Sequence, residues 1–342
     1  MSTATDKLNN GLTIPVIGLG CWMGAPGKVG ENQETKTMVA NALEVRVCLA
    51  AVVRRLVRSG SINFPFQIQA GYTHFDTSSG YGNEEAVGAA IRESGVPRET
   101  LFVTTKLVFS DHGRVAEAFE TSLKLLDIDY VDLYLIHWPQ AKDPETNKWL
   151  RPDEYPTIND TWAQMEKLLA GGKVRTIGVS NFSVQLLERL ASTSTVTPAV
   201  NQVECHPYHP QIELSAYAKS RNIHLTSYCP LGQYNSPLLE EDIIKEIAAK
   251  HDKTPGQVLL SWNVQRGPGG WSAVPKSSNP TRLAQNLATF ELSSEEMEAV
   301  SKLHEEPGKN KSLCVYPGGQ DVPGEVYGWT LEEMGWETKL YA

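Results

Sequence analysis

Four side chains that could act in acid–base chemistry lie at or just after the ends of apolar, β-rich runs. Asp76 ends one run in HFDTSSGYGNEE and Tyr81 follows it, while Lys106 and His137 end the next two runs, LFVTTKL and DLYLIHWP. A lysine or histidine directly after an apolar strand is poorly explained as solvated surface. Taken singly, each residue also has a structural interpretation: a loop cap, a packed tyrosine, a snorkelling lysine or a hydrogen-bonded core histidine. Their place on consecutive strands favours a shared site.

These four residue types can together reduce a carbonyl group. Reduction needs a hydride donor and a proton donor that acts while negative charge develops on oxygen. A phenol has a pKa of about 10, and a neighbouring ammonium lowers it, so Lys106 would make Tyr81 a better acid. Asp76 would keep a buried lysine charged, and His137 would orient the carbonyl through a hydrogen bond. The predicted proton donor is therefore Tyr81, with Lys106 as its tuner and Asp76 as the anchor.

The elements that would position these residues alternate along the chain. Alternation of strands and helices implies parallel strands, and eight repeats imply closure into a (β/α)8 barrel, whose strand ends converge on one mouth. A doubly wound open sheet is the alternative. The expected strands are Ile14–Trp22, Tyr72–Thr77, Leu101–Leu107, Val131–Trp138, Val174–Ser180, Ala199–Cys205, His224–Tyr228 and Ser272–Pro275.

Helix and turn signals agree with this pattern. Thr254-Pro255 places a cap residue before a proline at the first helical position, and Ser293 with Glu296 forms a capping-box pattern. Asn10-Gly11 predicts a tight turn and therefore an N-terminal β-hairpin. The first expected helix begins near Glu34, and the others are Glu84–Glu93, Val115–Leu126, Ile158–Leu169, Ser183–Leu190, Glu213–Ser220, Leu238–Lys250, Pro255–Gln265 and Arg282–Ala288.

Composition narrows the class of protein. The chain of 342 residues is 41% hydrophobic, enough for one large core, and carries a net charge of -9. This balance argues against a nucleic-acid or anionic-membrane partner. The five cysteines form no C-x-x-C pair. The N-terminus has no apolar signal core, and no stretch of 18 or more apolar residues that could span a membrane occurs. We expect a monomeric cytoplasmic protein with a small-molecule carbonyl substrate and no metal.

Two segments depart from a regular single barrel domain over residues 1–342. Residues 45–69 carry four arginines and no acidic residue where an ordinary helix-to-strand connection would do. One hypothesis is a retained intron, because the first codon, for Val, begins GT and the last, for Gln, could be CAG. A helix extension or a surface excursion is the alternative. The tail, residues 308–342, is rich in Gly, Pro and aromatic residues and is expected to be an ordered wrap or a long loop.

The chain resembles an aldo-keto reductase in a series of motifs that appear in family order. The resemblance implies the (β/α)8 fold and a catalytic tetrad at Asp76, Tyr81, Lys106 and His137. It covers nearly everything from residue 8 to about 305 apart from the insertion. The matching segments are GLTIPVIGLGCW, THFDTSSGYGNEEAVG, FVTTKL, DLYLIHWP, TWAQMEKLLAGGKVRTIGVSNFS, PAVNQVECHPY, YCPLG and VPKSSNPTRLAQN.

The same resemblance implies an NADP(H) site. Ser180, Asn181 and Gln202 resemble the residues that bind the nicotinamide carboxamide, and Tyr228 resembles the tyrosine that stacks on the nicotinamide ring. Polar tips on neighbouring strands beside an aromatic residue suit a flat heteroaromatic ligand, although capping of strand-end loops is an alternative. Leu231 would contact the nucleotide from a loop that is short compared with some relatives, which predicts faster cofactor exchange.

A basic segment resembles the pocket for the 2′-phosphate of NADP. Lys276, Ser277 and Arg282 would bind the phosphate, because an arginine fork and a lysine charge suit a dianion. Asn286 resembles an adenine contact, and Gln285 stands where many relatives have Glu.

The resemblance implies NADPH-dependent reduction of aldehydes by direct hydride transfer, reversible with polyols. Ketones and sugars are further candidate substrates. Trp22 and Trp138 would wall the substrate pocket together with His137, although packing at the barrel rim is an equally good interpretation of either tryptophan. The alternative function is a nucleotide-binding regulatory subunit with little turnover, as in relatives that serve potassium channels. The intact tetrad argues against it.

Overall fold

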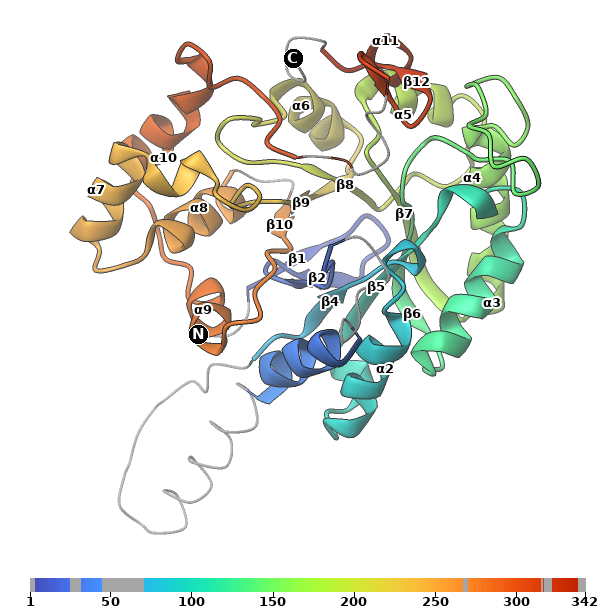
Figure 1. Cartoon of the computed structure of the whole chain (residues 1–342), viewed down its shortest axis with the longest axis horizontal. Coiled ribbons are helices and arrows are strands. Elements are labelled where there is room, and N and C mark those ends of the chain that lie inside the picture. The colour runs from blue at the N-terminus through green and yellow to red at the C-terminus, as the bar shows by residue number, and fades with distance from the viewer. Residues whose placement is uncertain are drawn as a thin grey trace.

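Eight parallel strands form the centre of the molecule. The computed structural model describes residues 4–24, 32–44, 71–266, 270–314, 316 and 322–337. Hydrogen bonding orders the strands consecutively from β3 to β10, and Figure 1 shows them in the middle of the molecule. The strands are β3 (Leu19–Gly20), β4 (His74–Asp76), β5 (Phe102–Leu107), β6 (Val131–Ile136), β7 (Val174–Ser180), β8 (Val200–Glu204), β9 (His224–Tyr228) and β10 (Trp271–Ala273).

The sheet closes on itself where its first and last strands meet. Ile17 and Ala273 form a parallel bridge, and the amide of Gly18 donates to the carbonyl of Ala273 at 2.9 Å. The amide of Ala273 donates in turn to the carbonyl of Val16 at 2.8 Å. The predicted (β/α)8 barrel is therefore confirmed, and the open doubly wound sheet is excluded.

Helices surround the strands on the outside of the barrel (Figure 1). Residues 32–44 are helical, as the predicted first helix requires. The sequence predicted one helix over Leu238–Lys250. The structure instead has a short 3-10 helix, η5 (Pro237–Glu240), and a separate α-helix, Asp242–Lys250, because the backbone at Glu241 is extended. After the helical residues 32–44, the α-helices around the barrel are α2 (Glu84–Glu93), α3 (Val115–Leu126), α4 (Ile158–Leu168), α5 (Val184–Ala191), α6 (Ile212–Ser220), α7 (Asp242–Lys250), α8 (Pro255–Val264), α9 (Pro280–Leu287) and α10 (Ser294–Ser301).

The predicted helix starts are confirmed in detail. The Thr254 side chain accepts from the amide of Gln257, whose side chain binds the Thr254 amide in return, and Pro255 stands at the first helical position. Ser293 and Glu296 form the same reciprocal pair at the start of α10. Each box satisfies two backbone amides that a helix N-terminus would otherwise leave unpaired.

The first predicted strand was too long. Residues 14–22 divide between β2 (Thr13–Pro15), which pairs antiparallel with β1 (Thr5–Lys7), and the barrel strand β3. Both pieces are buried, so the apolar pattern runs on unbroken and conceals the division. The predicted hairpin is confirmed, and its turn contains Gly11 at a φ of 88°, which glycine adopts without strain.

The described part of the tail packs back onto the barrel as an ordered wrap. It contains β11 (Glu325–Val326), β12 (Trp329–Thr330) and α11 (Leu331–Met334), which lie near α5 in Figure 1. The Gln140 amide donates to the carbonyl of Val326 at 2.9 Å, and the indole of Trp329 donates to the carbonyl of Leu150 at 2.7 Å. The unusual segment 45–69 lies outside the described residues.

Within the described ranges, no helix has the length and apolar character needed to cross a membrane.

Candidate active site

The barrel brings the four predicted catalytic side chains to the same ends of neighbouring strands. Asp76 is the last residue of β4, Lys106 is the penultimate residue of β5, and His137 directly follows β6. Tyr81 ends the short 3-10 helix η1 (Ser79–Tyr81) that follows β4. Parallel pairing of β4 with β5 and of β5 with β6 places these ends side by side. The sequence prediction of a shared location is therefore confirmed.

Lys106 and Asp76 form a buried ion pair. The ammonium of Lys106 lies 2.6 Å from Oδ1 of Asp76 and donates to the carbonyl of Thr77 at 2.9 Å. Oδ2 of Asp76 accepts from the side-chain amide of Gln202 at 2.7 Å. Lys106 is completely buried and Asp76 is 2% exposed. A charge in such surroundings is stable only when it is paired and hydrogen bonded, as this one is.

The Tyr81 ring lies beside both the Lys106 ammonium and the His137 imidazole. The ammonium of Lys106 lies 5.1 Å from the centroid of the Tyr81 ring, and the ring meets that of His137 edge to face with centroids 5.5 Å apart. Burial raises the pKa of Tyr81 well above its usual value, and the Asp76 charge raises it further. The lowered pKa expected from the sequence is therefore wrong for this structure, because burial of the ring and the Asp76 charge both raise it.

His137 is a neutral imidazole. Burial lowers the pKa of His137 well below its usual value, and the Lys106 charge lowers it further. Its Nδ1 lies 3.0 Å from Oγ of Ser78, a hydroxyl that also accepts from the amide of Gly80 at 3.2 Å. Ser78 caps η1, so one residue contacts His137 and begins the turn that carries Tyr81. The sequence prediction did not include Ser78.

The residues expected to face a nicotinamide ring gather next to this cluster. The side-chain amide of Asn181 donates to the carbonyl of His137 at 2.9 Å, and the hydroxyl of Tyr228 donates to Oδ1 of Asn181 at 2.8 Å. Ser180 donates through Oγ to the carbonyl of Gln202 at 2.8 Å. Because Gln202 also binds Asp76, the two predicted groups of residues form one continuous hydrogen-bonded cluster.

The residues expected to bind a phosphate lie on the loop after β10 and on α9. Lys276 and Arg282 are exposed, and neither forms an ion pair with a described residue. Ser277 is buried, and the α9 N-terminus has Pro280 at its first position and is capped by Asn279. A lysine on the loop before α9 and an arginine in its first turn, neither paired with a described carboxylate, fit a phosphate dianion. Three further predicted nucleotide contacts are described, of which Asn286 is buried and Gln285 and Leu231 are half-buried.

The two tryptophans expected to wall the substrate pocket differ in their surroundings. Trp22 follows β3 and is 38% exposed, whereas Trp138 is 5% exposed. Trp138 packs edge to face against Tyr316 and Tyr327 of the tail, with ring centroids 5.0 and 4.9 Å apart. The tail therefore covers one side of the region next to His137.

A second residue that the sequence prediction missed is Glu204, the last residue of β8. It is 2% exposed and accepts hydrogen bonds from residues of the tail, including the hydroxyl of Tyr316 at 2.9 Å. A signal was present, because Glu204 is the penultimate residue of the expected strand Ala199–Cys205 and lies inside the motif PAVNQVECHPY. Its partners in the tail lie more than a hundred positions further along the chain, so no local pattern connects them to Glu204.

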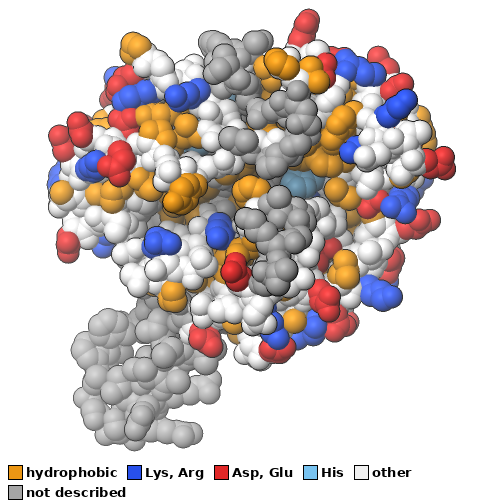
Figure 2. Space-filling view, in the orientation of Figure 1, with side chains coloured by type: hydrophobic (Ala, Val, Ile, Leu, Met, Phe, Trp, Pro, Cys, Tyr) orange, Lys and Arg blue, Asp and Glu red, His pale blue; other side chains and the backbone are white. Residues whose placement is uncertain are grey.

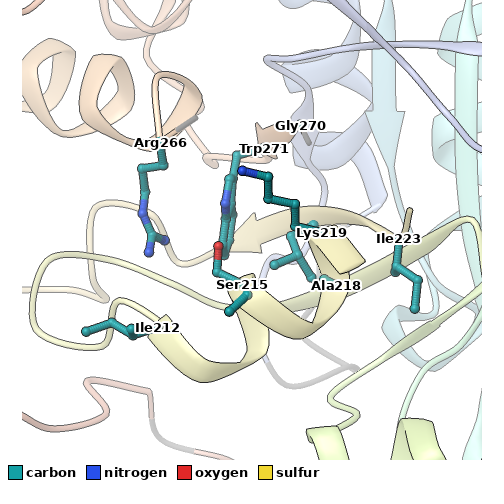
Figure 3. Close-up of a pocket in the computed structure, with 10 residues that line it drawn as sticks. Ile212, Ser215, Ala218, Lys219, Ile223, Arg266, Gly270 and Trp271 are labelled. Atoms are coloured by element: carbon teal, nitrogen blue, oxygen red, sulfur yellow. The ribbon is translucent and has the colours of Figure 1, made fainter. Parts of the chain in front are cut away.

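A cavity of about 250 Å³ lies elsewhere, between α6 and the starts of β9 and β10, at the opposite ends of these strands from the candidate site. Figure 3 shows Trp271 between Arg266 and Lys219 at this cavity. The guanidinium of Arg266 stands 4.3 Å from the centroid of the Trp271 ring and 2.7 Å from Sγ of Cys205. Arg266 therefore stabilises packing here. Figure 2 shows hydrophobic side chains scattered over one face of the molecule, interspersed with charged side chains that are most numerous toward its margin.

Known proteins match the chain along most of its length. The model of the aldo/keto reductase family matches residues 66–305. Glycerol 2-dehydrogenase (NADP(+)) of Saccharomyces cerevisiae is 39% identical over 342 aligned residues, which cover 95% of this chain and 97% of the yeast protein. D-galacturonate reductase of Hypocrea jecorina is 37% identical and covers 93% of this chain and 96% of its own length.

Solved structures of aldo-keto reductases superpose on most of the chain. An aldo-keto reductase of Bombyx mori, crystallised in complex with NADP, superposes with a TM-score of 0.77 at 33% identity, covering 94% of this chain and 98% of its own. An aldo/keto reductase from Brucella melitensis superposes with a TM-score of 0.71 at 36% identity, covering 88% of this chain and 98% of its own. The sequence matches, the closed barrel and the clustered side chains lead to one conclusion: the chain belongs to the aldo/keto reductase family.

Proposed function

We propose that the protein is an NADP(H)-dependent oxidoreductase that reduces aldehydes and ketones to alcohols and runs in reverse with polyols. The observation that carries the proposal is the buried Lys106–Asp76 ion pair, with Tyr81 and His137 beside it at the strand ends. Burying a lysine ammonium costs desolvation free energy that an apolar side chain of similar size would not, so its presence here favours a catalytic role. The family membership supports the same activity.

Tyr81 is the proposed proton donor. The raised pKa keeps its phenol protonated at neutral pH, which is the state that reduction requires. When the proton moves to the carbonyl oxygen, a phenolate remains in a buried position. The Lys106 ammonium lies 5.1 Å from the ring centroid and stabilises that charge as it forms. Asp76 holds the ammonium in place through the 2.6 Å contact.

His137 is the proposed orienting group for the substrate carbonyl. Its lowered pKa makes the ring neutral, so it carries one N–H. If the Ser78 hydroxyl donates to Nδ1 across 3.0 Å, the proton of the ring is on Nε2, where it can bind the substrate oxygen. Ser78 accepts from Gly80, which leaves its own O–H for this bond.

The residues present fit NADP(H) as the cofactor, which when bound supplies or accepts the hydride. Ser180, Asn181 and Gln202 would hold the nicotinamide carboxamide, and the Tyr228 ring would lie against the nicotinamide face. Lys276, Ser277 and Arg282 would bind the 2′-phosphate, which fits two exposed cations that no described carboxylate pairs. Asn286 and Gln285 would contact the adenine, and Leu231 the nucleotide backbone.

Small polar carbonyl compounds are the proposed substrates. Trp22 and Trp138 would limit the bulk of the substrate next to His137. The relatives named above act, by their names, on glycerol and D-galacturonate. Short hydroxyaldehydes, uronates and polyols are therefore the first compounds to test. We also propose that the protein is a monomer and that its partners, apart from the cofactor, are such small molecules and neither nucleic acids nor membranes.

An NADPH-oxidation assay with the purified full chain tests the proposal. The panel would contain glyceraldehyde, glucuronate, xylose and substituted benzaldehydes, with NADH in place of NADPH as the matched cofactor control. We expect turnover with at least one aldehyde and a clear preference for NADPH. Absence of turnover with every aldehyde, in a protein that is folded and binds NADPH, would contradict the proposal and leave a binding function.

A further inference from the structure

The carboxylate of Glu204 binds the tail at one point of the barrel mouth. Its Oε1 accepts from the amides of Leu313 and Cys314 at 2.7 and 3.1 Å, and its Oε2 accepts from the hydroxyls of Ser312 and Tyr316 at 2.6 and 2.9 Å. The ring of His206 adds a contact to Oε1 at 2.8 Å. Four donors from one short stretch of the tail thus meet a single buried charge.

This carboxylate remains ionised in the neutral pH range. Burial alone would raise the pKa of Glu204, but the hydrogen bond and charge of His206, helped by His209 and Ser312, lower it well below its usual value. Hydrogen bonds to a buried anion are stronger than those between neutral groups. The tail is therefore attached to the end of β8 by charge-assisted bonds and not by apolar packing alone.

From Tyr316 the contacts continue to the candidate active site. The hydroxyl oxygens of Tyr316 and Tyr228 lie 3.3 Å apart, and the Tyr228 hydroxyl donates to Oδ1 of Asn181 at 2.8 Å. The Asn181 amide donates to the carbonyl of His137 at 2.9 Å. On its other side the Tyr316 ring stands edge to face with Trp138, with centroids 5.0 Å apart.

We propose that Glu204 is a positioning residue of the reductase reaction: it holds the tail's Tyr316 against Tyr228 and Trp138 and so fixes one wall of the nicotinamide and aldehyde sites. The inference rests on the proposed function, because it takes Tyr228 to face the nicotinamide. Glu204 touches neither substrate nor cofactor in this account. It acts through Tyr316, whose hydroxyl it binds and whose ring it orients.

Tyr316→Phe is the central test, and Ser312→Ala is its matched control. Both changes delete one hydroxyl bonded to the same oxygen of Glu204, but only the first breaks the contact with Tyr228. We expect Tyr316→Phe to raise the Kd for NADPH and the KM for the aldehyde by about 3- to 10-fold, the effect of one hydrogen bond. The value of kcat should change less than twofold, and Ser312→Ala should leave all three constants near wild type.

Glu204→Gln and the double variant Glu204→Gln/Tyr316→Phe complete a cycle. If Glu204 acts through Tyr316, the double variant binds NADPH no more weakly than Glu204→Gln alone. Additive effects, equal effects of Tyr316→Phe and Ser312→Ala, or unchanged constants in Tyr316→Phe would each overturn the proposal. Should Glu204→Gln fail to fold, the comparison of Tyr316→Phe with Ser312→Ala still decides.

NADPH binding would be measured by quenching of tryptophan fluorescence, which needs no turnover. A wild-type protein that binds NADPH but reduces no aldehyde would contradict the proposed function while the Kd comparison remained valid. A weaker Kd in Tyr316→Phe alone would then still support the positioning role of Glu204. The two failures are therefore distinguishable.

Discussion

Two buried carboxylates end strands of the same barrel, and their partners differ. Asp76 at the end of β4 binds the Lys106 ammonium and the Gln202 amide. Glu204 at the end of β8 binds the His206 ring and four neutral donors of the tail. Each carboxylate is 2% exposed. The first arrangement keeps a cation beside a phenol, and the second attaches a long segment to the barrel.

The comparison teaches how one architecture separates chemistry from positioning. Asp76 and its partner come from adjacent strands, so the barrel alone fixes their distance. Glu204 lies at a strand end and four of its partners lie in the tail, so these four contacts form only when the tail docks. Changes at Asp76 or Lys106 should therefore affect turnover, and changes at Glu204 should affect binding.

The largest expected effect is that of Lys106→Met. The change removes the charge that would stabilise a Tyr81 phenolate, and we expect kcat to fall by about 10³-fold. It also leaves Asp76 buried without a cation, which should cost about 3–5 kcal/mol of the free energy of unfolding. Steady-state kinetics and urea denaturation measure the two effects.

Lys173→Met is the matched control for stability. Lys173 forms an ion pair with Glu120 at 2.8 Å, but both side chains are about half exposed. A surface pair of this kind contributes about 0–1 kcal/mol. Equal losses of stability in the two variants would mean that the buried Lys106–Asp76 pair has no special role.

A smaller effect is expected at the exposed cation Arg282. If its guanidinium binds the 2′-phosphate, Arg282→Ala should raise the KM for NADPH by about 10- to 100-fold, since bonds to charged groups are the strong ones. The KM for NADH, which lacks that phosphate, should not change. Kinetics with both cofactors measure the difference, and an equal rise for NADH would show that Arg282 does not read the phosphate.

The last comparison concerns the free energy of unfolding in acid. The buried His112 should make it depend on pH below 6.5, whereas the buried carboxylate of Glu204 should not. Burial lowers the pKa of His112 to about 3, and neither ring nitrogen has a hydrogen-bond partner among the described residues. An unfolded histidine has a pKa of about 6.5, so between these values the unfolded chain binds one more proton than the folded chain. Stability should therefore fall as the pH drops below 6.5, by up to about 1.4 kcal/mol per unit from this group.

His112→Leu should make the unfolding free energy less dependent on pH in that window. Glu204 stays ionised there because its pKa is lowered, so the tail anchor should persist. Denaturant melts at a series of pH values measure the slope. An unchanged slope in His112→Leu would show that other groups dominate the acid response.

Much of the barrel and the tetrad could be predicted from sequence because each depends on local patterns. Strand ends follow from apolar runs, and parallel pairing then brings Asp76, Lys106 and His137 together. The division of residues 14–22 was missed because both pieces are buried. The anchor at Glu204 was missed because it joins segments more than a hundred residues apart. The direction in which the pKa of Tyr81 shifts depends on how deeply the ring is buried, and the residue types in the sequence do not give that burial.

The most direct test of the central claim compares wild type with Tyr81→Phe, by turnover and by NADPH binding. Removing the phenol oxygen deletes the proposed proton donor and leaves the ring that packs against His137. The account predicts that kcat falls by about 10²- to 10⁴-fold, while the Kd for NADPH and the thermal stability stay near wild type. A Tyr81→Phe enzyme that reduces aldehydes at close to the wild-type rate would show that the proton comes from another group.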